Sequence, residues 1–294
     1  MIERLAGKVA VVTGGASGIG RAMGERFGRE GMNVVLADVE APALSATVAD
    51  LRTRSLRVTG VVTDVASYEA VVSLRDQVME RHGAVHLLCN NAGIGAGAEG
   101  HLWDHELNDW RWAVNVNLYG VIHGINAFVP VMLEQGDEGH VVNTSSGNGG
   151  IAPLHTTAQY AVTKAAVVTL TECLYAQLQD AESRIGASVL FPGPHMLRTG
   201  LFTSWRNRPP ELAKQRPRRE PYPTMEDLER RMEAAGVEVS YTPVEEVAER
   251  VVVAVRAGDF WIIPPSDRTD DQIRTRADSL LKRENPTYLR EVPG

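Results

Sequence analysis

The chain has 294 residues, of which 44% are hydrophobic and 23% are charged, a composition typical of a soluble globular protein. Its net charge of −7 gives no support for binding nucleic acid. No apolar run approaches the ~18 residues that span a membrane, and no signal-peptide pattern precedes the first apolar run. Cys89 and Cys173 lie in apolar segments without metal spacing. We therefore predict reduced core thiols, no metal site, no nucleic-acid or membrane partner and a cytoplasmic location.

Short apolar runs alternate with amphipathic stretches along most of the chain. The valine-rich runs predict buried strands at residues 8–13, 33–38, 56–64, 85–90, 140–145, 188–192 and 259–263. Helical patterns occupy residues 18–30, 40–53, 67–82, 104–133, 157–181, 224–235 and 243–257. This alternation predicts an α/β fold with a Rossmann-type, doubly wound parallel sheet. We expect a single domain over residues 1–265 and a peripheral, charged C-terminal extension over residues 266–294.

The first strand leads directly into a glycine-rich loop, TGGASGIG at residues 13–20. Gly14, Gly18 and Gly20 would let the backbone approach a pyrophosphate, and the following helix would supply amide donors and the positive end of its dipole. Such a cluster can also be a structural turn, but its place between a strand and a helix favours nucleotide binding. We assign Ser17 and Ile19 to the same loop.

Asp38 ends the second predicted strand, 18 residues after Gly20. Its carboxylate could accept hydrogen bonds from an adenosine ribose and would repel a 2′-phosphate. No lysine or arginine lies in the segment LADVEAPALS. We therefore predict NAD as the cofactor in preference to NADP; the alternative role of Asp38 is to cap the next helix.

The third and fourth strands also end in polar residues. Asp64, followed by Val65, could meet the adenine edge of a dinucleotide, and a turn or cap role is the alternative. The sequence NNAG at residues 90–93 follows the fourth strand, where the glycine would permit close approach of the cofactor and the asparagine side chains would tie neighbouring strands together. We include three of these residues in the cofactor site: Asn91, Ala92 and Gly93.

Tyr160 and Lys164 are four residues apart in a predicted helix, so their side chains share one face. A free tyrosine has a pKa near ~10, and a nearby ammonium would lower it. The pair is therefore suited to moving a proton near neutral pH. A hydroxyl upstream, Ser146, could hydrogen-bond the substrate oxygen, with Ser145 as the rival, and Lys164 could also hold ribose hydroxyls.

Taken together and in order, the motifs TGGASGIG, NNAG, VNLYG, NTSS, YAVTK and FPG resemble the short-chain dehydrogenase/reductase family. The resemblance covers roughly residues 5–195 and resumes at 243–265. It implies a sheet of about seven strands in the order 3-2-1-4-5-6-7 and a tetrameric or dimeric assembly. By position, it implies that Tyr160 is the acid/base, Lys164 its electrostatic partner and Ser146 the substrate-orienting residue. Asn117 would hold a water that links Lys164 to solvent; its alternative role is a polar residue at a helix kink.

The sequence also departs from the family pattern. Ser146 precedes Tyr160 by 14 residues, one more than is usual for the family. In PGPHMLRTG the resemblance places Pro192, Gly193 and His195 beside the nicotinamide carboxamide, with His195 where a valine is usual. Thr199 lies two residues later than the usual threonine, which leaves its role open.

Residues 195–240 form an insert that we interpret as a substrate lid. Trp205 and Tyr222 could roof an apolar pocket. Between residues 206 and 219 the insert also carries six basic residues, which predict a solvated basic lid or, as the alternative, a site for an acidic substrate: Arg206, Arg208, Lys214, Arg216, Arg218 and Arg219.

From these patterns we predict an NAD-dependent oxidoreductase that interconverts a secondary alcohol and a ketone, on a bulky lipophilic or aromatic substrate. One alternative is a 3-oxoacyl-thioester reductase of the same fold, which the acid at position 38 disfavours because such reductases usually use NADPH. A non-catalytic dinucleotide-sensing protein is the alternative from another class. The helices at 104–133 and 157–181 carry more apolar surface than one sheet face needs, which favours a homotetramer or homodimer.

Overall fold

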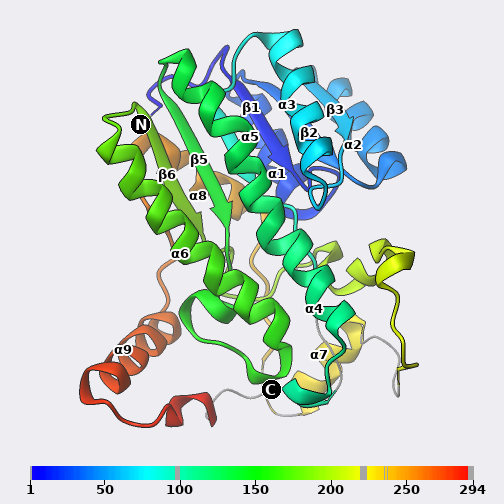
Figure 1. The fold of residues 1–294 in the computed structure, drawn as a ribbon, viewed down its shortest axis with the longest axis vertical. Coiled ribbons are helices and arrows are strands. Elements are labelled where there is room, and N and C mark those ends of the chain that lie inside the picture. Colours follow the sequence, from blue (N-terminus) through cyan, green and yellow to red (C-terminus); the bar gives the residue numbers. More distant parts are fainter. Residues whose placement is uncertain (1, 97–99, 219–223, 235, 237, 291–294) are drawn as a thin grey trace.

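The computed structural model describes residues 2–96, 100–218, 224–234, 236 and 238–290. Seven parallel strands form one sheet in the order β3-β2-β1-β4-β5-β6-β7, which confirms the predicted topology (Figure 1). The strands are β1 (Val9–Thr13), β2 (Asn33–Asp38), β3 (Val58–Val62), β4 (Leu87–Asn90), β5 (Gly139–Thr144), β6 (Ile185–Leu190) and β7 (Trp261–Ile262).

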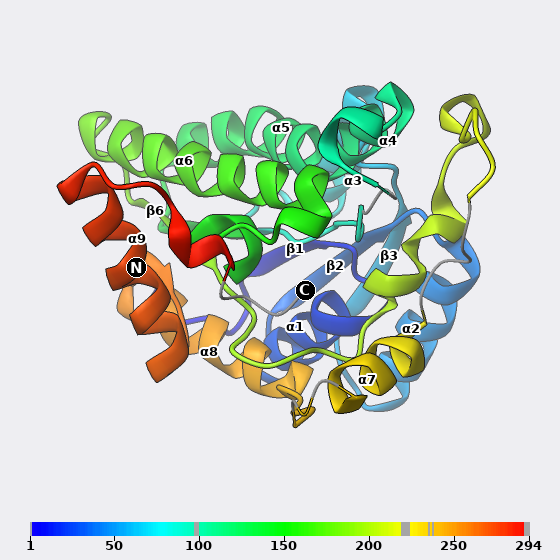
Figure 2. The same ribbon diagram turned by 90° about the horizontal axis from the view of Figure 1, so that it is seen from below.

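Helices cover both faces of the sheet (Figure 2). One layer contains α1 (Gly18–Arg29), α2 (Ala41–Thr53) and α8 (Val244–Ala257); the other contains α3 (Tyr68–His82), α5 (Gly120–Gln135) and α6 (Ala158–Asp180). Because side chains alternate along a strand, β1 supplies both cores. Val9 and Val11 pack in the core that contains Phe128, and Val12 packs in the core that contains Phe27. Burial on both faces explains why the strands appear in the sequence as continuous apolar runs.

The predicted helix at residues 104–133 is not continuous. It consists of α4 (Leu107–Val114), a widened π-helical turn (Asn115–Tyr119) and α5. The stretch from Leu107 to Gln135 is long and apolar enough to cross a membrane by length and composition. In this fold it is a core helix: a Cβ at Gly124 would lie 2.0 Å from Asn90 Oδ1, so α5 rests directly on the end of β4.

The structure corrects the sequence predictions at the C-terminal part of the chain. The strand predicted at 188–192 begins earlier, at Ile185, and β7 has only two residues. Residues 267–282, which we predicted only as a peripheral extension, form the helix α9 (Asp267–Lys282). Two kinds of signal mark it in the sequence. Ser266 Oγ accepts a hydrogen bond from Thr269 N and the first turn is acidic, and Ile273, Ala277, Leu280 and Leu281 recur at helical spacing. Cys89 is buried as predicted, but Cys173 is exposed, so it is not a core thiol.

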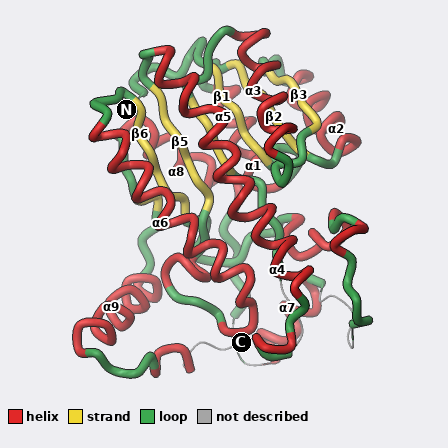
Figure 3. The backbone as a smooth tube through the Cα atoms, viewed as in Figure 1, coloured by secondary structure: helices red, strands yellow, loops and turns green. Residues whose placement is uncertain are grey.

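All seven strands end at the same edge of the sheet, and the segments outside the sheet gather there (Figures 1 and 3). The described part of the insert contributes two 3₁₀ turns (Gly200–Asn207 and Pro210–Leu212) and α7 (Met225–Ala234). With α4 and α9, these elements surround the carboxyl ends of the strands. In a doubly wound sheet this edge is where ligands bind.

One histidine is fully enclosed in the sheet. His140 in β5 has no exposed surface, and its Nε2–H donates to Ser188 Oγ at 2.6 Å. The serine hydroxyl in turn donates to the carbonyl oxygen of Asp259 at 2.6 Å, which leaves the serine oxygen to accept. Burial lowers the pKa of His140 from 6.5 to about 3, because water no longer stabilises the imidazolium.

This pKa predicts acid sensitivity. A neutral, buried His140 contributes stability that is fully present above pH 6.5 and is lost as the pH falls from 6.5 towards 3, because the unfolded chain then binds the extra proton. Because pH 5 lies about 1.5 units below the unshifted histidine pKa of 6.5, the loss of unfolding free energy at pH 5 should be roughly 2 kcal/mol. We expect His140→Gln to reduce the difference in unfolding free energy between pH 7 and pH 5, measured by urea unfolding. His155→Gln, at an exposed position, is the control; an equal effect of both changes would contradict the assignment.

Candidate active site

The loop between β1 and α1 has a backbone that only glycine can adopt without strain. Gly14 and Gly18 have φ values of +67° and +53°, in the left-handed region. A Cβ at Gly20 would lie 2.1 Å from the carbonyl oxygen of Gly14. The three glycines of the motif are thus required by the turn and by the contact of α1 with it.

The start of α1 fits an anion. The first backbone N–H groups of a helix, here those of Gly18, Ile19 and Gly20, have no acceptor within the helix. Ser17 is the N-cap residue, and its side chain makes no capping hydrogen bond. These groups fit the pyrophosphate of a dinucleotide, which the loop would hold against the positive end of the helix.

Asp38 lies at the carboxyl end of β2 and holds the glycine loop. Its Oδ2 accepts a hydrogen bond from Ala16 N at 2.9 Å, and its Oδ1 accepts one from Glu40 N at 3.0 Å. Each carboxylate oxygen retains further capacity to accept, so the residue fits a ribose diol as well as its structural role. The sequence did not indicate that a cation lies near this point, where Arg206 from the insert forms an ion pair with Glu40.

The ends of β3 and β4 are arranged differently. Asp64 is exposed, and its Oδ1 accepts from Ala66 N at 2.9 Å, which is the turn role considered as its alternative. Val65 is buried against Gly120. At the end of β4 the asparagine side chains do join strands: Asn90 Nδ2 donates to Asn143 Oδ1 at 2.9 Å.

The residues after β4 line the centre of the carboxyl edge. Asn91 Nδ2 donates to the carbonyl oxygen of Thr13 at 3.0 Å, and Ala92 N donates to Thr13 Oγ1 at 3.0 Å. A Cβ at Gly93 would lie 3.4 Å from Lys164 Nζ and 3.3 Å from Asn117 Oδ1. The predicted cofactor residues of this segment and the predicted catalytic residues therefore meet at one place.

The structure brings Ser146 and Tyr160 together across the loop after β5. The Ser146 hydroxyl lies close enough to the Tyr160 side chain to lower the pKa of the phenol, and its Oγ accepts a hydrogen bond from Asn148 N at 3.2 Å. Ser145, the rival for the serine role, is buried and donates its hydroxyl to the carbonyl oxygen of Lys164 at 2.7 Å. Ser146 is thus the serine beside the tyrosine, and Ser145 holds the helix.

Lys164 is 3% exposed, and its Nζ donates to the carbonyl oxygen of Thr144 at 2.8 Å. Burial lowers its pKa from 10.5 to about 8. The ammonium lies 5.7 Å from the centroid of the Tyr160 ring, on the face of the ring.

The predicted effect of Lys164 on the tyrosine is wrong for the protein without cofactor. Burial raises the pKa of Tyr160 above its usual 10, and only the neighbouring Ser146 side chain lowers it. Desolvation disfavours the phenolate and the ammonium alike, and the lysine donates to a backbone carbonyl instead of the phenol. In this state Tyr160 holds its proton.

Asn117 lies in the π-helical turn and is fully buried. Its Oδ1 accepts from Ile94 N at 2.8 Å, and its Nδ2 donates to the carbonyl oxygen of Ile94 at 3.1 Å and to Thr163 Oγ1 at 3.3 Å. The residue therefore does occupy a distorted part of the helix, as its alternative role requires, and it also joins the loop after β4 to α6 beside Lys164.

The segment after β6 is held mainly by groups that the sequence did not indicate. Arg250 of α8 donates to the carbonyl oxygens of both Pro192 and Gly193 at 3.0 Å. His195 N donates to Thr242 Oγ1 at 3.2 Å, and the exposed His195 ring pairs with Ser240. The N–H of His195 is thus already engaged, so the backbone contact that we predicted would have to use its carbonyl oxygen.

Thr199 lies directly over the glycine loop. A Cβ at Gly18 would be 3.1 Å from Thr199 Cγ2. Beyond it, the insert continues across the carboxyl edge: Gly95 N donates to Ser204 Oγ at 3.0 Å, and a Cβ at Gly95 would lie 2.7 Å from the carbonyl oxygen of Leu201. The insert therefore crosses the candidate cofactor site, and Thr199 is a further candidate for contact with a bound dinucleotide.

Four basic residues of the insert pair with carboxylates, and one of them, Arg216, still exposes 66% of its side chain to solvent. Arg208 Nη1 and Lys214 Nζ lie 2.7 and 3.0 Å from the two carboxylate oxygens of Asp109 in α4. Although burial alone would raise it, these hydrogen bonds hold the pKa of Asp109 below its usual value. Arg216 lies against Glu106, 3.5 Å away.

With Arg206 on Glu40, four of the six basic residues are thus paired with carboxylates. Arg218 also has an interaction partner. Arg219 and Tyr222 lie outside the described residues. The ion pairs weaken the case for an acidic substrate at the insert, because these charges already have partners.

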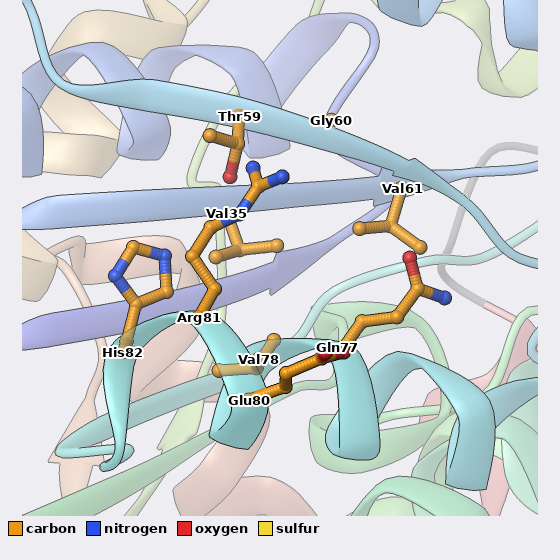
Figure 4. A pocket seen from close by; sticks show the side chains of 9 residues that line it. All are labelled: Val35, Thr59, Gly60, Val61, Gln77, Val78, Glu80, Arg81 and His82. Carbon is orange, nitrogen blue, oxygen red and sulfur yellow. The ribbon is translucent and has the colours of Figure 1, made fainter.

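A hollow of about 390 Å³ lies elsewhere in the molecule, between β2, β3 and the end of α3 (Figure 4). Val35 and Val78 line its floor, and Arg81 and His82 project beside it. Because α3 runs antiparallel to the strands, its end lies towards their amino ends. The hollow is therefore remote from the carboxyl edge and contains none of the predicted site residues.

Comparison with known proteins places these observations in context. Residues 8–209 match the family model for short chain dehydrogenase. The crystal structure of a short-chain dehydrogenase/reductase from Burkholderia phymatum in complex with NAD is 38% identical, with a TM-score of 0.86 and 98% of both chains covered. A short-chain dehydrogenase from Burkholderia cenocepacia J2315 in complex with NADP is 27% identical, with a TM-score of 0.70, over 88% of this chain and 95% of that chain. The 1-deoxy-11-beta-hydroxypentalenate dehydrogenase of Streptomyces exfoliatus is 37% identical over 63% of this chain and 66% of that protein.

Proposed function

The chain belongs to the short-chain dehydrogenase/reductase family, and on that premise we propose that it is an NAD-dependent oxidoreductase that interconverts a secondary alcohol and a ketone. The observation that carries the proposal is the meeting of Ser146, Tyr160 and Lys164 beside Gly93, at the edge where the glycine loop would hold a dinucleotide. A bound dinucleotide would supply the hydride acceptor or donor at its nicotinamide.

The protein's own residues would handle the proton and the substrate. Tyr160 holds its proton in the buried site, so it can donate that proton to a ketone oxygen and take it back from an alcohol. Ser146, within hydrogen-bonding reach of the same hydroxyl, would bind the substrate oxygen and orient it. Lys164 would stabilise negative charge on the phenol and contact the ribose. Asn117 would connect the lysine to solvent through a water.

We propose a bulky lipophilic or aromatic substrate. Several large apolar side chains are exposed in the segments that surround the carboxyl edge: Leu102, Trp103, Leu107 and Trp205. Exposed apolar surface around a site favours apolar ligands. The hydroxypentalenate dehydrogenase among the relatives supports a carbon-rich alcohol.

The two alternatives receive less support. An acyl-thioester with an anionic carrier would need free cations near the entrance, and four of those in the insert are paired. A protein that only senses a dinucleotide would not need a serine hydroxyl next to a tyrosine hydroxyl beside a buried lysine. Turnover of any alcohol would show that the protein is an enzyme and would exclude the non-catalytic sensor.

The cofactor prediction depends on Asp38. A 2′-phosphate there would meet the carboxylate that holds Ala16 and Glu40, so NAD should bind more tightly than NADP. Asp38→Ala should reduce this preference by roughly tenfold or more, about 1.4 kcal/mol of lost repulsion. The measurement is the dissociation constant of each dinucleotide by titration. Asp64→Ala is the control and should change both constants alike; a wild-type preference for NADP would refute the assignment.

We propose a homotetramer or homodimer in solution. Large apolar side chains remain exposed along α5 and α6. Tyr119 directly precedes α5 and Leu133 lies on it, and Val162 and Tyr175 lie on α6. Such surface is typical of subunit interfaces. Sedimentation velocity at micromolar concentration should show an oligomer, and Val162→Arg should shift it towards monomer. Leu281→Arg, at an exposed position of α9, should not. A purely monomeric wild type would contradict the proposal.

The role of Tyr160 has the sharpest test. Tyr160→Phe removes only the hydroxyl that carries the proton, so turnover should fall by roughly 10²–10⁴ while NAD affinity changes little. Tyr175→Phe on the same helix is the matched control and should keep full turnover. The substrate screen uses NAD with secondary alcohols that include 1-phenylethanol, 1-indanol and borneol, followed by the absorbance of the reduced cofactor. Near wild-type turnover by folded Tyr160→Phe would overturn the mechanism.

A further inference from the structure

The C-terminal helix α9 contacts the body of the protein beside the predicted catalytic serine. None of its residues is buried, and it packs against the loop Gly147–Ile151, which directly follows Ser146. Among the described residues of α9, only Arg276 makes a hydrogen bond to a distant part of the chain: its Nη1 donates to the carbonyl oxygen of Ile151 at 2.5 Å. The polar attachment of α9 is therefore made on the active-site loop.

This loop rests directly on the helix that carries Tyr160. Gly149 has a φ of +102°, and a Cβ there would lie 2.1 Å from the carbonyl oxygen of Ala161. The loop also determines where Ser146 lies, because Gly150 N donates to the carbonyl oxygen of Ser146 at 3.1 Å. A displacement of the loop would change the distance between the serine and tyrosine hydroxyls.

Two side chains hold the two ends of the loop. At the first end, Asn148 Nδ2 donates to Thr157 Oγ1 at 2.8 Å, and its Oδ1 accepts from Leu154 N at 2.8 Å. At the other end, the side chain of Ile151 is buried in a small apolar cluster, while its carbonyl oxygen accepts from Arg276. Asn148 is local to the loop, whereas Arg276 lies 125 residues away along the chain.

We propose that Arg276 is a positioning residue for substrate turnover: by holding the carbonyl oxygen of Ile151, it keeps the loop that follows Ser146 against α6. The inference rests on the proposed function, in which Ser146 binds the substrate oxygen. A hydrogen bond from a guanidinium is charge-assisted and stronger than one between neutral groups. Through it, the C-terminal helix becomes part of the substrate side of the site.

The test compares Arg276→Met with Arg274→Met, a charge-matched change at an exposed position two residues earlier. With the secondary alcohol that turns over fastest in the screen, Arg276→Met should lower kcat/KM by about tenfold, while the dissociation constant of NAD stays unchanged. Amide exchange at Gly150 and Ala152, whose N–H groups bond within the loop, should become faster. Arg276→Lys, which keeps one charged donor, should restore much of the activity, and Arg274→Met should match the wild type.

Faster exchange confined to α9, with kcat/KM and the loop amides unchanged, would show that Arg276 only anchors the helix and would overturn the proposal. If Arg276→Met fails to fold, the same three measurements on Arg276→Lys and Arg276→Gln decide: equal values for both variants and the wild type refute it. If the wild type oxidises no secondary alcohol, the proposed function fails instead, and the exchange at Gly150 and Ala152 still decides whether Arg276 holds the loop.

Discussion

Two hydrogen bonds in opposite directions join Lys164 to the end of β5, and the arrangement of the site depends on them. The ammonium donates to the carbonyl oxygen of Thr144, and Ser145 donates its hydroxyl to the carbonyl oxygen of Lys164. Together they dock the first turns of α6 on the carboxyl edge of the sheet. Because Tyr160 lies one turn earlier on α6 and Ser146 follows Ser145, the same docking sets the distance between the two hydroxyls that would handle the substrate.

The docking removes water from Lys164 and Tyr160, and this desolvation shifts the pKa values of both groups. An ammonium buried against one carbonyl has lost most of its water, which lowers its pKa to about 8, and the neighbouring phenol is kept protonated for the same reason. Without cofactor, the protein therefore has a protonated phenol, Tyr160, next to an ammonium, Lys164, that loses its proton more easily than a solvated lysine. In the proposed function, the pair would become a base only when further positive charge or hydrogen bonding favours the phenolate, which a bound cofactor and substrate would have to supply.

The sequence predicts the parts of this molecule that depend on local spacing. The glycine loop and the tyrosine–lysine pair are visible because a turn and a helical face are properties of a few consecutive residues. Strand order follows from the family resemblance and the alternation of elements. The contacts of Arg250 with Pro192 and Gly193, of Arg208 with Asp109, and of Arg276 with Ile151 join residues 57 to 125 positions apart. An arginine that serves such a contact has the same local sequence signals as one on a solvated surface, and the pKa of Tyr160 likewise depends on burial that only the folded chain produces.

These distant arginines share one task. The carboxyl edge of a parallel sheet consists of loops, whose backbone groups are not paired by the sheet. Here the loop after β6 is held from α8 by Arg250, the insert is held on α4 by Arg208, and the loop after β5 is held from α9 by Arg276. Arg250 and Arg276 reach their loops from helices outside them, whereas Arg208 belongs to the insert and reaches out to α4; in each case a guanidinium supplies donors in a fixed geometry. The sheet therefore provides the edge, while the guanidinium groups hold the loops around it, and substitutions of these arginines would alter the site without touching a predicted catalytic residue.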